Sequence, residues 1–267
     1  MNKATIQFVL NAMIFSFCGL AWGDNKIDVV TSISVGMLDT DYTFSEDIIG
    51  GTLAPTGMVV ERTFASSQVQ SMEVGVTVVD NNIYYGFTSL IAGQSNGDYR
   101  EWVAGTSIGN GSTQVMTRSS GSGYIGYSGF ENIGLYGGYT YGKAGVGAKI
   151  NIEDDGPFVG VKYTHFFGSY STLTFDLSYS YLQSEINIEG IAGTSQRFEI
   201  DTNTRGTSLS LTWVRAMDRG RSFFVRYNIK DMSIAEAGIN YTGPYVGTSA
   251  TIIGTQNMSA LSIGVGF

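Results

Sequence analysis

The sequence contains little cysteine, histidine, proline or basic charge. Cys18 is the one cysteine and His165 the one histidine, and only 3 of the 267 residues are proline. Because Cys18 lies in the first apolar stretch, loss of that stretch would leave no thiol for a disulfide framework. Lys and Arg total 15, against 23 Asp and Glu. This balance argues against a nucleic-acid partner, which requires a basic patch.

Long apolar runs are also missing, apart from one near the N-terminus. Lys3 precedes an apolar stretch over 4–20, and Ala21-Trp22-Gly23 places small residues at the two positions that a signal peptidase reads. We predict a signal peptide over 1–23, cleaved after Gly23, and a single mature domain over 24–267. Two alternatives remain. One is a lipoprotein acylated at Cys18, although Phe17 stands where a small residue is expected. The other is a retained membrane helix, for which the stretch is short.

The mature chain has alternation instead of long apolar runs. No run in it approaches the ~20 residues of a membrane helix. From Ser171 to Tyr181, apolar and polar residues take turns, and successive side chains of a strand point to opposite faces. The apolar face of this segment consists of Leu173, Phe175, Leu177, Tyr179 and Tyr181. Strands of ~9–11 residues with one apolar and one polar face are what a transmembrane β-barrel requires.

Other segments repeat the pattern along the chain. Apolar residues recur at every second position, with few exceptions, in seven further segments. These segments are Val29 to Met37, Met72 to Val78, Ile83 to Ile91, Val159 to Phe167, Leu209 to Trp213, Phe223 to Ile229 and Leu261 to Phe267. We therefore predict an all-β fold, a closed antiparallel transmembrane β-barrel of about 10 strands, with 8 or 12 as alternatives. Bacterial barrels have even strand counts, and closure removes the sheet edges that lipid disfavours.

Polar stretches between these segments predict the connections. The stretches over 93–121, 184–205 and 231–257 are interpreted as long external loops. Turns near Asn81, Gly142, Gly168 and Asp218 are interpreted as short periplasmic ones, and 153–156 as a further turn. Three alternating pieces fall between 122 and 152. To keep the count even, we interpret 123–130 as an extension of 132–141, joined by a bulge near Glu131.

Charged residues on the polar faces predict a charged lumen. The candidates are Glu73, Lys149, Lys162, Asp176, Arg226 and Lys230. A Lys or Arg that faces lipid costs ~2–4 kcal/mol at the midplane, which favours the inward orientation. A tight turn near Gly168 would bring Asp176 within salt-bridge reach of Lys162. These charges form either a packed polar core or a narrow pore. A ten-stranded barrel lies between the filled and the open sizes, so geometry leaves both open.

The end of the chain, LSIGVGF, places four apolar residues on one face. These are Leu261, Ile263, Val265 and Phe267. Together with the leader and the amphipathic strands, this ending resembles the small outer-membrane β-barrel proteins of Gram-negative bacteria. The resemblance implies residence in the outer membrane and contact with its lipid and lipopolysaccharide. It also implies that periplasmic chaperones and the outer-membrane assembly machinery are partners, with the C-terminal segment as the assembly signal.

Catalytic and metal-binding groups are sparse. Omptin-like proteases and lipid A deacylases resemble this size class and need a catalytic histidine near the external rim. His165 is instead predicted near the periplasmic turn at Gly168, facing lipid, whereas Asp176 and Ser178 face inward, so no Ser-His-acid unit shares one face. We expect no enzyme activity, cofactor or metal. The acids over 153–155 could bind calcium or bridge to lipopolysaccharide, although a solvated acidic turn is the simpler interpretation.

Three functions are therefore weighed. The first is a non-enzymatic outer-membrane barrel that is structural or forms a narrow passive channel for small polar solutes. The second is a surface-binding or adhesion barrel that acts through its long external loops. The third and least favoured is an outer-membrane hydrolase.

Overall fold

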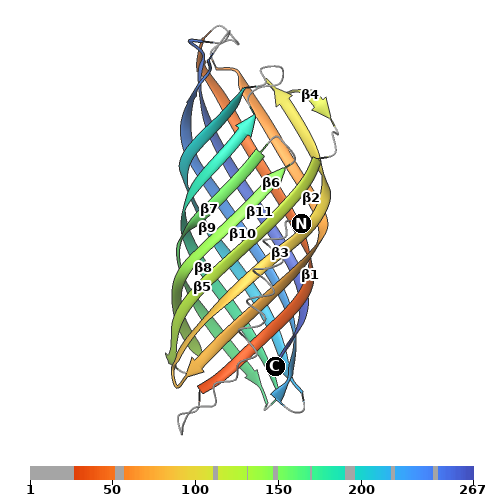
Figure 1. Ribbon diagram of the computed structural model, residues 1–267, viewed down its shortest axis with the longest axis vertical. Helices are drawn as coiled ribbons and strands as arrows, with labels where there is room; N and C mark the ends of the chain where they lie inside the picture. Colours follow the sequence, from red (N-terminus) through yellow and green to blue (C-terminus); the bar gives the residue numbers. More distant parts are fainter. Residues whose placement is uncertain are drawn as a thin grey trace, which may run out of the picture.

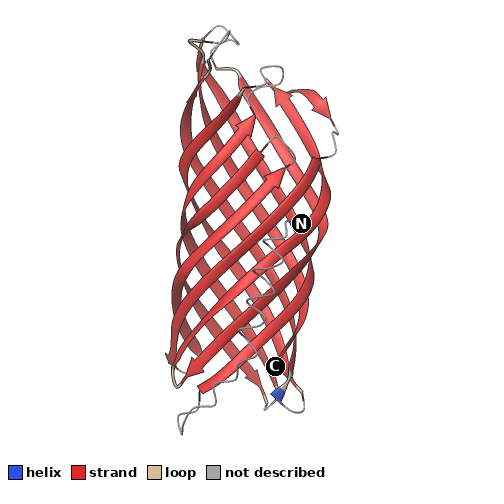
Figure 2. Cartoon of the chain, in the orientation of Figure 1, coloured by secondary structure: helices blue, strands red, loops and turns tan. Residues whose placement is uncertain are grey.

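A computed structural model describes residues 27–51, 57–110, 114–130, 132–146, 150–168, 170–189, 196–217, 220–242 and 246–267. The signal peptide expected over 1–23 lies outside these residues. Within them the chain is built of antiparallel strands (Figure 2). No helix among the described residues is long and apolar enough to cross a membrane.

Ten strands close into a ring, which confirms the predicted barrel. In chain order the strands are β1 (Ile27–Gly50), β2 (Val59–Asp80), β3 (Ile83–Val103), β4 (Thr106–Asn110), β5 (Gln114–Phe130), β6 (Ile133–Val146), β7 (Ile150–Phe167), β8 (Ser171–Glu189), β9 (Arg197–Ala216), β10 (Ser222–Asn240) and β11 (Ser249–Gly266). Hydrogen bonding runs from β2 through β1 and β11 back to β3, and a β2–β3 pairing closes the ring. The short β4 pairs with β3 and stands at one rim (Figure 1).

The strands are much longer than a membrane needs. β1 contains 24 residues, whereas about 9–11 tilted residues span a bilayer. One end of the barrel carries the chain's C-terminus and short connections at 81–82, 131–132, 168–170 and 217–221, at the bottom of Figure 1. We call the half next to this end the membrane half and the remainder the projecting half.

In the membrane half the outer surface is apolar. Phe175 and Leu177 of β8 are 46% and 50% exposed, so both point away from the lumen as predicted. The outward residues of β1, β3, β7 and β11 behave in the same way, among them Val35, Phe87, Val159 and Ile263. Such a band is what acyl chains contact in membrane barrels.

In the projecting half the two faces exchange character without a break in the strand. On β8, Leu182, Ile186 and Ile188 point inward and are at most 2% exposed, while the outward residue Glu185 is exposed. On β1 the same change occurs between Met37, which is exposed, and Leu38, which is buried. The inward side chains of this half form one apolar core: Tyr42, Phe44, Ile48, Val60, Phe64, Tyr99, Ile150, Ile152, Ile186, Ile188, Phe198, Ile200, Ile234, Ile239, Tyr241 and Ile252 belong to it.

This exchange corrects several expectations about the connections. The stretches over 93–121, 184–205 and 231–257 are mainly strand, not long loops, since β3, β5, β8, β9, β10 and β11 continue through them. Residues 153–156 belong to β7, and Gly142 belongs to β6. The outward side of these stretches is polar because water replaces lipid there. Our interpretation mistook that change of face for the end of a strand.

The region over 122–152 also differs from expectation. Residues 123–130 belong to β5 and 132–141 largely to β6, and these are two separate strands that pair with each other from Phe130↔Ile133 to Met116↔Val146. Glu131, where we predicted a bulge, lies outside the described residues, between the end of β5 and the start of β6. The piece over 144–152 is no strand of its own, because β6 ends at Val146 and β7 begins at Ile150. The count of ten in the ring survives because two errors cancel.

Glycines make room for aromatic rings inside the membrane half. A Cβ on Gly126 would lie 2.3 Å from Cζ of Tyr84, and one on Gly160 would lie 2.3 Å from Cζ of Tyr136. In both pairs the glycine and the ring face each other across neighbouring strands. Covering of a strand glycine by an aromatic side chain is a known way to fix register. The Tyr84 and Tyr136 rings therefore occupy space in the lumen that these two glycines leave free.

Candidate functional site in the barrel lumen

The lumen contains three polar arrangements stacked along the barrel axis. Lowest in the membrane half are four of the six charges predicted from the sequence. Glu73 of β2 forms an ion pair with Arg226 of β10, and Arg226 Nε also donates to Thr212 Oγ1 at 3.3 Å. The pair joins strands on opposite sides of β1 and β11. It therefore lies across the lumen and helps to fill it.

Lys162 and Asp176 are direct cross-strand neighbours on β7 and β8. The structure shows no direct ion pair between these two described residues. Lys162 Nζ lies 3.4 Å from the centroid of the Tyr84 ring, a cation–π contact, and Asp176 accepts a hydrogen bond from the Tyr136 hydroxyl. The expected salt bridge is thus replaced by two aromatic contacts. All four groups occupy the same lower layer.

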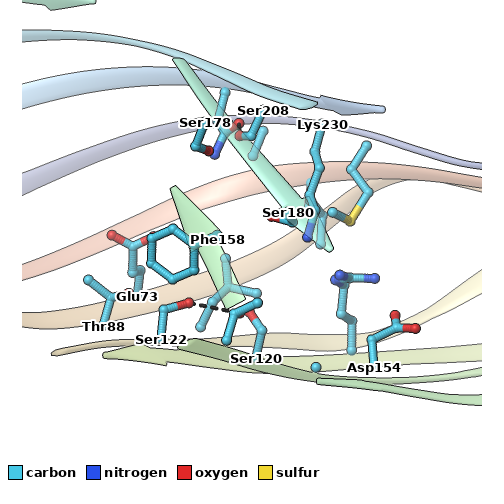
Figure 3. Close-up of a pocket in the computed structure, with 18 of the residues that line it drawn as sticks. Glu73, Thr88, Ser120, Ser122, Asp154, Phe158, Ser178, Ser180, Ser208 and Lys230 are labelled. Carbon is cyan, nitrogen blue, oxygen red and sulfur yellow. Dashed lines mark hydrogen bonds between the residues drawn. The ribbon is translucent and has the colours of Figure 1, made fainter. Parts of the chain in front are cut away.

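Above this layer lies a cavity of about 220 Å³. Its wall carries the hydroxyl groups of Thr88, Ser120, Ser122, Thr140, Ser178, Ser180 and Ser208, together with the charged residues Glu73, Arg118, Asp154 and Lys230 (Figure 3). Arg118 donates to the Tyr42 hydroxyl at 2.8 Å, and Asp154 accepts from Ser184. The cavity lies between the lower aromatic layer and the apolar core of the projecting half. It is a chamber within the lumen.

The third arrangement is a buried charge cluster within the apolar core. Arg62 Nη2 lies 3.0 Å from Glu46 Oε2, and Arg62 Nε lies 3.4 Å from Glu101 Oε1. All three side chains are at most 4% exposed. The hydroxyl of Tyr99 donates to Glu101, and that of Tyr241 donates to Glu46. Five side chains, four from β1, β2 and β3 and one from Tyr241 directly after β10, thus satisfy one another where water is excluded.

This burial changes the acidity of Glu46. Removal of the carboxylate from water raises the pKa of Glu46 above its ordinary value, and the nearby Arg62 guanidinium opposes the rise. Among the described residues the cluster has two acids and one base. A proton on Glu46 would therefore reduce its negative charge.

The remaining candidates lie outside the lumen or outside the described residues. Lys149 lies outside the described residues. His165 is exposed on the outer face beside the short turn after β7, where its ring packs edge-on against Phe167 at 4.6 Å between centroids. Leu261 and Ile263 on the outer face of β11 are about half exposed, as is Phe267 directly after this strand. Phe267 pairs with Thr31 through two backbone hydrogen bonds. The assembly signal itself stays a prediction.

The acids over 153–155 do not act together. Glu153 and Asp155 point outward and contact Lys143 and Tyr139, respectively, while Asp154 points into the lumen. Within the described residues no group of three or more His, Cys, Asp or Glu side chains is placed to hold a metal ion.

Sequence reasoning missed the Glu46–Arg62–Glu101 cluster and the cavity residues Arg118 and Asp154. Glu46 and Arg62 lie in segments that we did not interpret as strands, and Glu101, Arg118 and Asp154 were assigned to a loop or a turn. For Glu46, Arg118 and Asp154 the available signal was parity, because these residues occupy inward positions once β1, β5 and β7 are extended. For Arg62 and Glu101 parity gave no such signal, because a register shift separates each of them from the membrane half of its strand.

Comparison with known proteins supports the fold. No protein-family model matches the sequence, and no curated protein matches it. Among solved structures, the outer membrane protease OmpT from Escherichia coli matches with a TM-score of 0.64 at 12% identity, over 91% of this chain and 97% of OmpT. The β domain of the Bordetella autotransporter BrkA matches at 0.40 and 12% identity, over 88% and 99%. The outer membrane protein OprG from Pseudomonas aeruginosa matches at 0.38 and 10% identity, over 89% and 95%. The similarity to OmpT shows that the fold is a barrel of the outer-membrane type, and it says nothing about activity.

Proposed function

We propose that this chain is a non-enzymatic outer-membrane β-barrel with a closed lumen, which acts at the cell surface through its projecting half. One observation carries the proposal: the inward residues of the projecting half form a continuous apolar core. Tyr42, Phe44 and Phe64 are at most 2% exposed within it. A solute that crossed this layer would have to displace well-packed aromatic and aliphatic side chains. The structural role is therefore favoured over the narrow passive channel.

Placement in the outer membrane rests on the barrel itself. The band of exposed apolar side chains fits a bilayer, and helices and closed barrels are the spanning structures that satisfy every backbone group in lipid. Of the described residues, the exposed ones of the projecting half are mainly polar, which suits an aqueous surface. A cleaved leader and a C-terminal assembly signal would complete the route to this location.

An omptin-like protease is not favoured, although the OmpT fold is similar. The chain's one histidine lies at the short-turn end and on the outer face. A hydrolase that worked at the external rim would have to use another base.

Planar bilayer recordings of the mature chain test the closed lumen. We expect an electrically silent barrel under applied voltage. Stepwise conductance by the wild-type protein would overturn the closed lumen and support the narrow channel.

Labelling of intact cells tests the projecting half. Cys18 is absent from the expected mature chain, so single cysteines can be introduced. Asp47→Cys, on the exposed outer face of β1, should react with a membrane-impermeant maleimide, and Leu177→Cys, in the apolar band, should not. Equal protection of both cysteines would contradict a surface-exposed projecting half.

Surface binding is the second candidate function, and charge favours it. In the described part of the projecting half the exposed acids are Asp39, Asp47, Glu61, Asp98, Glu185, Glu199, Asp201, Asp231 and Glu236, against the exposed bases Arg100, Lys143, Arg197 and Arg205. A cationic partner fits such a surface.

A binding assay with fluorescent oligolysine tests this candidate function. We expect the double variant Glu185→Lys/Asp201→Lys to bind oligolysine more weakly than the wild type. The matched control Leu177→Ala/Leu209→Ala should bind it as the wild type does. Equal binding by all variants would count against it.

A further inference from the structure

The cavity in the middle of the barrel contains more positive than negative charge. Of its four charged wall residues, Glu73 is already neutralised by its ion pair with Arg226. Arg118, Lys230 and Asp154 remain, which leaves two cations against one anion. None of these three forms an ion pair with another within the described residues. They stand apart around a shared space.

Lys230 is the least satisfied of the three. Its side chain points inward from β10, between the cross-strand neighbours Ser208 and Met258, and lines the cavity. In the part of the chain that the structure describes, no group hydrogen-bonds to its ammonium. Figure 3 shows the Lys230 side chain reaching toward Ser180, with Asp154 on the other side of the same space. Asp154 attracts the ammonium and Arg118 repels it.

The rest of the wall mixes hydroxyl groups with apolar side chains such as Leu90, Phe158 and Met258. Ser120 and Ser180 line the cavity with hydroxyl groups that can each donate one hydrogen bond. A cation taken out of bulk water is costly unless it is paired and hydrogen-bonded. Hydroxyl donors and a surplus positive charge within one cavity favour an anion over a neutral solute. The volume of about 220 Å³ holds several waters of about 30 Å³ each, or one small ion with part of its water.

We propose that this cavity is a binding site for one small monovalent anion, held between Lys230 and Arg118 and coordinated by the serine hydroxyls. Halides and short carboxylates share the required chemistry, namely one negative charge and a small radius. Asp154 limits the site to a single charge, because its own carboxylate neutralises one of the two cations. The site is separate from the proposed surface function. A closed lumen and a bound structural anion are compatible, and either can fail alone.

Bromide is a direct probe of this site. Crystals of the mature protein in sodium bromide should show an anomalous peak between Lys230 and Arg118, and crystals of Lys230→Met should lack it. A wild-type crystal with no bromide in the cavity would overturn the proposal whatever the variant does.

Thermal unfolding in detergent gives a second, independent measurement. With bromide at ten times its half-saturating concentration, the folded-to-unfolded ratio of the wild type should rise about elevenfold, since a ligand of the folded state stabilises it by mass action. Lys230→Met should lose this response, and Lys143→Met, which removes an exposed lysine of the outer face, should keep it. General salt effects are common to all three proteins. An equal response in all three would therefore refute the site.

Discussion

The membrane half and the projecting half of this barrel use the same strands in opposite ways. In the membrane half of β8, Leu177 faces outward and Ser178 inward, whereas in the projecting half Ile186 faces inward and Glu185 outward. The backbone continues through both, and each side chain simply faces the medium that suits it. Apolar residues point to lipid where lipid is outside and to the lumen where water is outside. Along its axis the barrel therefore changes from a membrane barrel with an apolar outer surface to a barrel with an apolar core, like that of a water-soluble protein.

The difference predicts where single substitutions do most damage. The projecting half has an apolar interior, so a buried charge there depends entirely on its partners. The membrane half has a more polar interior with partly exposed charges such as Arg226 and Glu73, where water can replace a lost partner more easily. The effects below are ordered from the largest to the smallest.

Arg62→Met should be the most destabilising change. It leaves Glu46 and Glu101 as buried carboxylates without their base, and breaking a buried ion pair in this way costs ~3–5 kcal/mol. The triple variant Glu46→Gln/Arg62→Met/Glu101→Gln removes all three charges and should recover much of the loss. Urea unfolding of the detergent-refolded barrel measures both. If the triple variant were as unstable as Arg62→Met, the unpaired charges would not be the cause of the lost stability.

Ile186→Ala should come next, with Leu177→Ala as its matched control on the same strand. Ile186 is 1% exposed within a packed core, and truncation of such a residue costs ~2–5 kcal/mol through lost burial and the cavity left behind. Leu177 is 50% exposed, so acyl chains or detergent fill the space that its truncation leaves. The same unfolding assay should show a smaller effect there. If Leu177→Ala cost as much as Ile186→Ala, the distinction between the two halves would fail.

The sequence predicted the membrane half well because its alternation is unambiguous. Phe175 and Leu177 face outward, as the two-residue periodicity indicated. Our strand prediction failed in the projecting half, and it failed at one recurring feature, a pair of adjacent apolar residues. Met37-Leu38 and Tyr181-Leu182 each mark the point where the apolar face changes sides. We interpreted the polar outward residues beyond these pairs as loops, although their alternation continues.

The lumen was harder to predict because contacts across it depend on register. A β-bulge lies between Leu38 and Thr40 where β1 pairs with β2, and a further shift follows Ala92 where β3 pairs with β5. Each such irregularity changes which residues meet, and periodicity does not reveal it. The structure brings Glu73 and Arg226 together in the lumen, and their pairing across β1 and β11 follows only from closure of the ring. Likewise, Lys162 and Asp176 are neighbours as expected, yet each has an aromatic partner that spacing alone did not suggest.

Arg226→Met should have an intermediate effect in the membrane half. It removes the partner of Glu73 from a layer that is only partly buried, so we expect a loss of ~1–3 kcal/mol, the desolvation cost of one unsatisfied group. A double-mutant cycle with Glu73→Gln isolates the pair. A coupling energy near zero would mean that water in the lumen already satisfies both groups.

A pH dependence should follow from the raised pKa of Glu46. The folded state holds this proton more tightly than the unfolded state, so the contribution to stability is fully present below the ordinary glutamate pKa and is lost as pH rises through the folded-state value. Each tenfold difference in proton affinity is worth about 1.4 kcal/mol. Glu46→Gln should remove this slope, whereas Asp47→Asn, on the exposed face of the same strand, should retain it. Identical slopes in the wild type and Glu46→Gln would assign the titration to another group.

The smallest effect belongs to the ion pair on the outer surface of the projecting half. Lys143 and Glu153 are cross-strand neighbours on β6 and β7, and their side chains are 48% and 32% exposed. Exposed pairs of this kind contribute ~0.2–1 kcal/mol, and salt screens them. Lys143→Met should therefore shift the urea midpoint only slightly, and the shift should shrink further in high salt. A loss as large as that of Arg62→Met would mean that this face is covered in the folded protein, and the projecting half would then have lipid or a partner, not water, against its outer wall.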